Sequence, residues 1–140
     1  MPLSDDADIR RVLDAEVVAI VGCSTTPGKP AHDVPAYLQR HGYRVIPINP
    51  FADAVLGEPA FDELAAVETQ IDVVDVFRPS AEVPTILEAV RARHADRGDA
   101  GTAWLQLGIH HDDAVAAAEA DGLDVVEDRC MKIEHDRLIG

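Results

Sequence analysis

Cysteine, lysine and long apolar runs are all scarce in this sequence of 140 residues. The two cysteines, Cys23 and Cys130, cannot form the framework of several disulfides that stabilises many small secreted domains. No apolar run reaches the roughly 18 residues that a membrane-spanning helix needs. The acidic first residues also lack the basic-then-apolar layout of a signal peptide. We therefore expect a cytoplasmic protein in a reducing compartment, with no membrane partner.

The two lysines, Lys29 and Lys132, are among only 12 basic residues, whereas 26 residues are acidic, 17 of them aspartate, which gives a net charge of -14. A chain this acidic repels phosphate backbones over most of its surface, so we expect no nucleic-acid partner. Scarce lysine and abundant aspartate are typical of a halophilic protein, because at molar salt the Debye length falls to about 3 Å and the repulsion between surface charges is screened. The composition thus describes a habitat and leaves the function open.

Hydrophobic residues make up 47% of the chain, enough for the core of one domain over residues 1–140. Short runs rich in Val and Ile predict five strands, and continuous apolar runs are typical of strands buried on both faces. These runs lie at 17–21, 44–48, 72–77, 102–107 and 123–126.

Apolar residues with helical spacing lie between the predicted strands. The i, i+3, i+4, i+7 pattern occurs at 34, 37, 38 and 41, before Gly42, and again at 83, 86, 87 and 90, where Ser80 is expected to be the N-cap. An alanine-rich helix is predicted over 112–120, and a leading helix over about 5–14, with Ile9, Val12 and Leu13 facing inward.

Strands that alternate with helices, joined mostly by short connections, indicate an α/β fold with a Rossmann-like, doubly wound parallel sheet of five strands and helices on both faces. Such sheets bind ligands at the carboxyl ends of their strands, where the strand order reverses. The functional residues are therefore expected where strands end, in the segments 22–30, 48–51, 77–80 and 106–110.

The turn after the first strand, 22–30, lies between a strand and a helix, where backbone N–H groups favour an anion such as a phosphate. It does not match the dinucleotide fingerprint, because Ser24 occupies the position of the second glycine. It does not match a Walker A loop either, because five residues separate Gly22 from Gly28 and Pro30 follows Lys29. A phosphate-binding turn and an ordinary strand–helix turn both remain open, and Lys29 could serve either.

The next two strand ends carry polar groups. The segment Asn49-Pro50 lacks the acid that binds the ribose of NAD, and Asn49 either contacts a nucleoside or forms a turn before proline. In Phe77-Arg78-Pro79, Arg78 either pairs with a phosphate or forms an ion pair within the protein.

Two further candidates for chemistry are less persuasive. Cys23 begins a helix-entry turn that could lower its pKa and make it reactive, although a small residue chosen for packing is the simpler interpretation. Neighbouring histidines such as His110 and His111 point about 100° apart on a helix and rarely share a metal, so no metal site is expected. No assembled catalytic set is recognisable, so no catalytic residue is assigned.

Six segments together resemble the stand-alone coenzyme A-binding domain proteins, which are similar to the coenzyme A-binding domain of the succinyl-CoA synthetase α subunit. The resemblance covers about residues 10 to 136 and rests on the segments 21–24 with 29–30, 37–38, 42–50, 75–78, 104–109 and 128–135. It implies a Rossmann-like fold that binds coenzyme A. The implied contacts are Gly22, Cys23 and Ser24 for the diphosphate with Lys29 close by, Asn49 and Pro50 for the adenosine, Phe77, Arg78 and Pro79 along the cleft, and Gly108 beside the pantetheine arm.

The resemblance does not carry ligase activity over, because the synthetase has a second domain with a phosphorylated histidine and a nucleotide-binding partner subunit. We therefore expect a non-catalytic carrier or sensor of coenzyme A or acyl-CoA. The alternatives are a thiol redox enzyme acting on coenzyme A disulfide through Cys23, and a nucleotide-responsive regulatory domain. A homodimer is expected only on general grounds.

Overall fold

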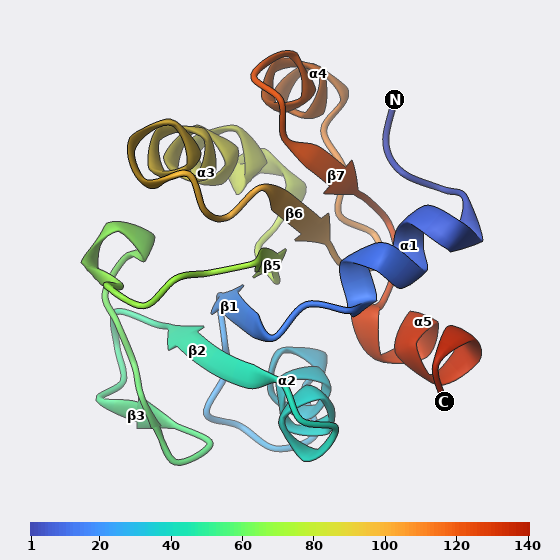
Figure 1. Ribbon diagram of the computed structural model, residues 1–140. Coiled ribbons are helices and arrows are strands. Elements are labelled where there is room, and N and C mark those ends of the chain that lie inside the picture. The colour runs from blue at the N-terminus through green and yellow to red at the C-terminus, as the bar shows by residue number, and fades with distance from the viewer.

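The computed structural model describes all residues, 1–140, as a central parallel sheet between two layers of helices (Figure 1). The sheet strands are β1 (Val17–Val21), β2 (Arg44–Ile48), β5 (Val73–Val76), β6 (Thr102–Leu105) and β7 (Asp124–Val126). All four pairings are parallel, in the order β2-β1-β5-β6-β7. The Rossmann-like sheet predicted from the sequence is confirmed. The order reverses between β1 and β5, because the chain passes to β2 on one side of β1 before it returns to β5 on the other.

The helices divide between the two faces of the sheet. Helices α3 (Val83–Arg97) and α4 (Asp112–Ala120) cover one face, and α1 (Asp6–Leu13), α2 (Pro30–Arg40) and α5 (Met131–Leu138) cover the other (Figure 1). Between β2 and β5 lie a small antiparallel hairpin, β3 (Ala54–Val55) with β4 (Glu58–Pro59), and the 3-10 turn η1 (Leu64–Ala66). A second 3-10 turn, η2 (Ser80–Glu82), precedes α3. No helix is both long enough and apolar enough to span a bilayer.

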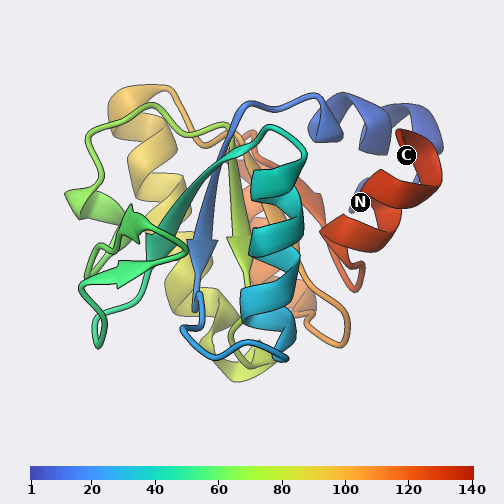
Figure 2. The same cartoon turned by 90° about the horizontal axis from the view of Figure 1, so that it is seen from below.

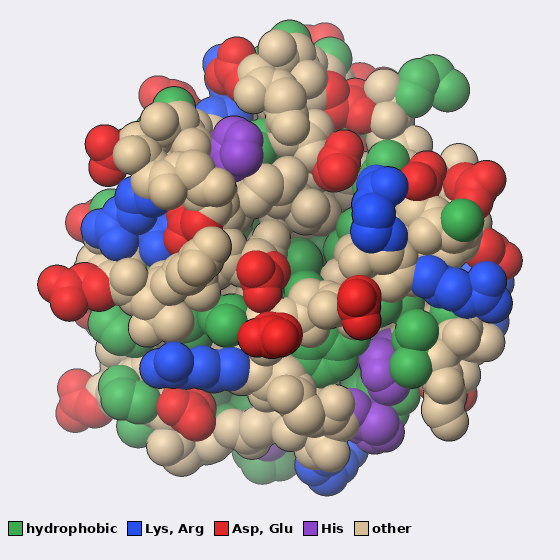
Figure 3. All heavy atoms as spheres, in the orientation of Figure 1, with side chains coloured by type: hydrophobic (Ala, Val, Ile, Leu, Met, Phe, Trp, Pro, Cys, Tyr) green, Lys and Arg blue, Asp and Glu red, His purple; other side chains and the backbone are tan.

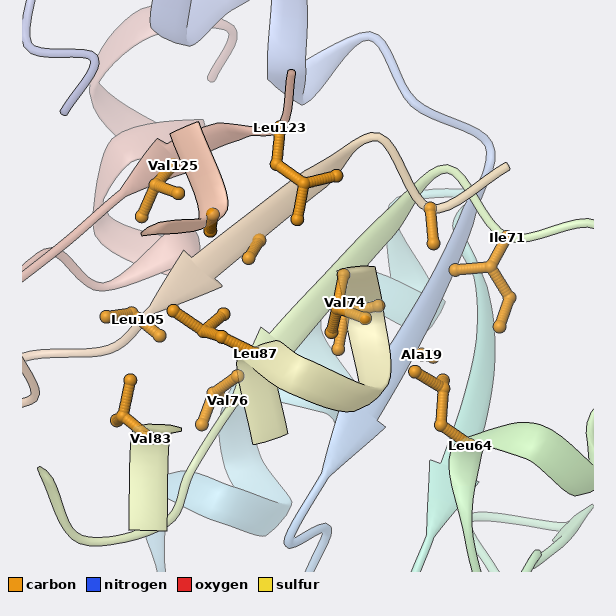
Figure 4. Packing of buried hydrophobic residues seen from close by; sticks show 14 of the residues in the cluster. Ala19, Leu64, Ile71, Val74, Val76, Val83, Leu87, Leu105, Leu123 and Val125 are labelled. Atoms are coloured by element: carbon orange, nitrogen blue, oxygen red, sulfur yellow. The ribbon is translucent and has the colours of Figure 1, made fainter. Parts of the chain in front are cut away.

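Two hydrophobic clusters, one on each face, hold the layers together. In β5, Val74 and Val76 belong to the cluster beneath α3 and α4, whereas Val73 belongs to the cluster beneath α1, α2 and α5. This alternation follows from the period of two along a strand. In the first cluster, Leu87 of α3 lies near Val76 of β5 and Leu105 of β6, and Leu64 of η1 lies beside Ala19 of β1 (Figure 4).

A buried ion pair fixes the loop around η1. The Arg93 guanidinium, on α3, donates to both carboxylate oxygens of Asp99 at 3.0 Å and to the backbone carbonyl oxygens of Leu64, Val67 and Thr69. Burial alone would raise the pKa of Asp99, but the hydrogen bonds from Arg93 and from the Ile71 amide hold it below its usual value. Three of the five hydrogen bonds that Arg93 donates therefore anchor the irregular segment around η1.

Most predicted elements are confirmed, with some ends displaced by one or two residues. Two helices differ from the sequence-based expectation, one in its N-cap and one because it was not predicted. Ser80 does not cap α3, because it lies within η2 and its hydroxyl oxygen accepts a hydrogen bond from the His110 amide at 3.1 Å. Helix α5 was not predicted, since two of its three buried residues, Glu134 and His135, are polar and hide the apolar spacing.

A carboxyl group lies in the middle of the sheet. Asp75 of β5 is completely buried, and its Oδ1 accepts a hydrogen bond of 2.6 Å from Nε2 of Gln106, whereas its Oδ2 has no partner. Burial disfavours the ionised form and raises the pKa of Asp75 to about 7. A carboxylate at this position opposes folding at neutral pH.

We predict that Asp75→Asn removes a pH-dependent loss of stability. In the unfolded chain the carboxyl ionises near its usual pKa of 3.8, whereas in the folded protein it stays protonated up to about pH 7. The free energy of unfolding should therefore fall as the pH rises from about 4 to about 7 and level off above that. At roughly 1.4 kcal/mol per pKa unit, the fall amounts to a few kcal/mol.

Urea unfolding between pH 4.5 and 8 in molar KCl measures this difference. In Asp75→Asn the free energy of unfolding should no longer depend on pH in that range. At pH 8 the variant should unfold at a higher urea concentration than the wild type, because an Asn side-chain oxygen can still accept a hydrogen bond from Gln106. Glu88→Gln, at an exposed position of α3, is the matched control for loss of one acid. Parallel curves for the wild type and Asp75→Asn would show that Asp75 is ionised in the folded protein.

Candidate functional site

A cavity of about 580 Å³ lies at the carboxyl ends of β1, β2 and β5, where the strand order reverses. Figure 2 shows β1 and β5 running to the same edge of the sheet, with the loop from β1 to α2 crossing that edge. Eight of the ten residues predicted for binding line the cavity: Gly22, Cys23, Ser24, Lys29, Asn49, Pro50, Phe77 and Arg78. The other two, Pro79 and Gly108, do not line it.

Gly22 lets two strand ends approach each other closely. Its φ is +84°, and a Cβ atom there would lie 2.7 Å from Cδ of Arg78 and 3.0 Å from the carbonyl oxygen of Phe77. The Gly22 amide donates to the Ile48 carbonyl oxygen at 3.1 Å, and the Phe77 amide donates to the Val21 carbonyl oxygen at 2.9 Å. The ends of β1, β2 and β5 are thus joined directly at the floor of the cavity.

The turn after β1 is held by its own hydrogen bonds. The Ser24 amide donates to the Ala31 carbonyl oxygen at 3.0 Å, and the Ser24 hydroxyl oxygen accepts from the Thr26 amide at 3.0 Å. Lys29 is the N-cap of α2 and makes no side-chain capping bond. The amino-terminal end of α2, which carries partial positive charge, therefore faces the cavity beside the Lys29 ammonium group.

Asn49 connects two of the loops. Its Nδ2 donates to the Cys23 carbonyl oxygen at 2.9 Å, and its Oδ1 accepts from the Phe51 amide at 2.8 Å. Of the two roles open from the sequence, the structure shows the turn-forming one, extended by a bond to the neighbouring loop. Asn49 positions the turn after β1 relative to the turn after β2.

Arg78 is already paired within the protein. Its Nη2 lies 2.7 Å from Oε2 of Glu82 and its Nε lies 3.2 Å from Oε1, so the guanidinium and the carboxylate meet through two bonds. Both side chains are about half exposed and both line the cavity. An anion that enters the cavity can therefore compete with Glu82 for the guanidinium.

Phe51 is a residue of the site that the sequence analysis did not single out. Its side chain is 95% exposed and lines the cavity directly after Asn49 and Pro50. A flat apolar ring exposed at a cavity is suited to stacking against a base. The signal in the sequence was the rarity of phenylalanine, of which the chain has three, combined with a position just past a strand end.

Of the two interpretations of Cys23, the structure favours the packing residue over the reactive thiol. The Cys23 side chain is 1% exposed, and burial, together with the nearby negative charge of Asp75, raises its pKa to about 12. The lowered pKa that the less favoured interpretation requires is not found, because removal of the thiol from water outweighs the hydrogen bond from the Ser24 backbone. At neutral pH Cys23 is a protonated packing residue.

The remaining candidates have structural roles. The Gly108 amide donates to Oδ1 of Asp128 at 2.7 Å, and Pro79 precedes η2. His111 is the N-cap of α4, and its Nδ1 accepts a hydrogen bond from the Ala114 amide at 3.1 Å. No three side chains of His, Cys, Asp or Glu converge in a geometry that could hold a metal ion.

The opposite edge of the sheet is unsuited to an anion. A hollow of about 400 Å³ there is lined by four acids, Asp14, Glu16, Asp72 and Asp124, and by one base, Arg11. Acidic side chains gather around the centre of the face shown in Figure 3. The cavity at the carboxyl ends carries two bases, Lys29 and Arg78, and two acids, and is thus less acidic than the protein as a whole.

Comparison with known proteins agrees with this geometry. Residues 16–136 match the model of a family described as the CoA binding domain. The chain is 33% identical over 130 residues to the uncharacterised protein YneT of Bacillus subtilis, covering 92% of this chain and 93% of that protein. It is 26% identical over 104 residues to an ADP-forming acetate–CoA ligase of Archaeoglobus fulgidus, covering 73% of this chain and 15% of the ligase. A solved structure from Thermus thermophilus shares 38% identity with a TM-score of 0.89 over 96% of this chain and 99% of that one.

Proposed function

Because the chain belongs to the CoA binding domain family, we propose that it binds coenzyme A or an acyl-CoA in the cavity at the carboxyl ends of β1, β2 and β5. One observation carries this proposal. The family's match spans the whole sheet, and the cavity lies where doubly wound sheets bind nucleotides, at the reversal of strand order.

The groups around the cavity suit the successive parts of the ligand. The amino-terminal end of α2, with Lys29, favours the diphosphate, and Arg78 can pair with a phosphate through two parallel hydrogen bonds. Phe51, beside Pro50, is suited to the adenine ring. These groups neutralise an anionic ligand locally within a chain whose net charge is -14.

We propose a carrier or sensor in preference to an enzyme. Three polar side chains of the cavity are engaged in structural bonds: Asn49 joins two loops, Ser24 closes a turn, and Arg78 pairs with Glu82. Such groups bind and orient a ligand. The thiol among the predicted contacts, that of Cys23, is protonated and buried.

Calorimetric titration of the protein in molar KCl tests the proposal. We expect saturable binding of coenzyme A and no saturable binding of NAD or NADH, because no acid follows β2 to hold the ribose diol of NAD. Titration with acetyl-CoA tests whether an acyl derivative of coenzyme A binds as well. Binding of NAD without any heat from coenzyme A would reverse the assignment.

A matched pair of variants examines the competition at Arg78. We expect Glu82→Gln to tighten coenzyme A binding several-fold, because it frees the guanidinium for a phosphate. Arg78→Gln should weaken binding by about tenfold, the loss of a charge-assisted hydrogen bond of about 1.5 kcal/mol. Calorimetry with dephospho-CoA as the second ligand locates the contact. If Arg78 contacts the 3′-phosphate, Glu82→Gln and Arg78→Gln should bind dephospho-CoA with the same affinity, because that ligand lacks the 3′-phosphate. If the wild type binds coenzyme A and dephospho-CoA with equal affinity, Arg78 does not contact the 3′-phosphate.

Phe51→Ala should weaken coenzyme A binding by about tenfold or more, since stacking of a base on an aromatic ring contributes about 1–3 kcal/mol. The melting temperature should not change, because the ring is 95% exposed and packs against little else. Ile139→Ala, at another exposed apolar residue but outside the cavity, is the control. Unchanged affinity of Phe51→Ala would mean that the adenine lies elsewhere.

A further inference from the structure

A second, apolar cavity of about 340 Å³ adjoins the proposed coenzyme A site. The two cavities share Lys29, Ala31 and Phe77 in their walls. From these shared residues the second cavity extends past the ends of β5 and β6 to Cys130, which follows β7. Two adjoining hollows, one with cations and one largely apolar, match a ligand with a phosphorylated nucleotide at one end and a thin, uncharged arm at the other.

Gln106 presents a hydrogen-bond acceptor to this second cavity. Its side chain lines the cavity although the residue is 95% buried, and its Nε2 is held by Oδ1 of Asp75 at 2.6 Å. The side-chain oxygen of Gln106 accepts no hydrogen bond from the protein. This oxygen is not shut away from the cavity, so a ligand that brings an amide N–H there can donate a hydrogen bond to it. The pantetheine arm of coenzyme A carries two amide groups.

Cys130 differs from Cys23 in the properties that control thiol chemistry. It is free and only partly buried, whereas Cys23 is buried and protonated at neutral pH. It is the N-cap of α5, its side chain makes no capping bond, and it lines both the apolar cavity and a third hollow that opens beside residues 1–4.

We propose that Cys130 exchanges with the disulfide form of coenzyme A, so that the protein holds the cofactor as a mixed disulfide at the far end of the apolar cavity. This inference rests on the proposed binding of coenzyme A. The Cys130 thiolate attacks one sulfur of coenzyme A disulfide and forms a new S–S bond. The original S–S bond breaks, and the second coenzyme A leaves as a thiolate that takes up the proton released by Cys130. Cys130 is oxidised, the departing coenzyme A is reduced, and no other reactant is needed.

Intact-mass spectrometry of the purified protein with coenzyme A disulfide, and separately with glutathione disulfide, tests the step. We expect one adduct, with the mass of one coenzyme A less two hydrogens, which peptide mapping places on Cys130 and a reductant removes. The adduct should form about tenfold faster or more with coenzyme A disulfide, because binding raises the effective concentration of the ligand at the thiol. Cys130→Ser should form none.

The variant Ala31→Leu tests the route between the cavities. A larger side chain at this shared position narrows the passage, so the ratio of the rates with coenzyme A disulfide and glutathione disulfide should fall toward one. An adduct mapped to Cys23, equal rates with both disulfides in the wild type, or an unchanged ratio in Ala31→Leu would each overturn the proposal.

Calorimetry of the wild type with coenzyme A under reducing conditions tests the binding of coenzyme A separately from the reaction of Cys130. Reversible binding of coenzyme A with no adduct from its disulfide would remove the role of Cys130 and leave the proposed function standing. The absence of both binding and adduct would remove both. An adduct on Cys130 that requires coenzyme A binding supports both together.

Discussion

The close approach of β1 and β5 at Gly22 is the contact on which the cavity depends. The parallel sheet brings three strand ends to one edge, and the reversal of strand order leaves a hollow there, but only if the first turn does not fill it. At Gly22 the backbone is left-handed and lies so near the Phe77 carbonyl that a side chain would displace one strand end or the other. The bonds from Gly22 to Ile48 and from Phe77 to Val21 then fix three strand ends as one floor. Loop residues such as Asn49 and Ser24 refine a geometry that the sheet has already set.

Electrostatics give this edge its character within a strongly acidic protein. With 26 acids and 12 bases, most of the surface repels an anionic cofactor at low salt. The cavity balances two bases with two acids and adds the end of α2, so the local field differs from that of the whole molecule. The Arg78–Glu82 pair has a particular consequence. It keeps a half-exposed guanidinium ordered at the cavity, yet any phosphate must exchange with a carboxylate already in place. The contribution of Arg78 to the affinity for a phosphate is therefore the difference in free energy between its ion pair with the phosphate and its ion pair with Glu82. This difference depends only weakly on the net charge of the protein.

The parts of the structure that could be predicted from the sequence are those governed by short-range periodicity. Runs such as 17–21 and 44–48 predict buried strands because every residue except Arg44 is apolar, and their ends follow from glycine and proline. The segment from β3 to η1 was not foreseen, because its anchor is Arg93, some 24 to 29 residues further along the chain. Helix α5 was missed for a related reason, since it buries polar residues. At the site, the strand-end rule brought eight candidates to one cavity. It could not show that Glu82 is the partner of Arg78, that Phe51 is exposed, or that Cys23 is buried, because strand-end positions do not specify how side chains pack in three dimensions.

The two cysteines illustrate why position along the chain is a poor guide to reactivity. Both follow strand ends at the same edge of the sheet, and the turn at Cys23 is the one that the sequence marks as a ligand site. Yet Cys23 packs into the cluster beneath α2, near a fully buried carboxyl group, and both effects disfavour the thiolate. Cys130 begins a helix at the mouth of a cavity and is only partly buried. Desolvation thus divides two chemically identical groups into a packing residue and an accessible thiol. The buried Asp75 that opposes ionisation of Cys23 also accepts a hydrogen bond from the side-chain nitrogen of Gln106, which leaves the Gln106 oxygen free. One carboxyl group in the core therefore influences both the proposed coenzyme A cavity and the apolar cavity beside it.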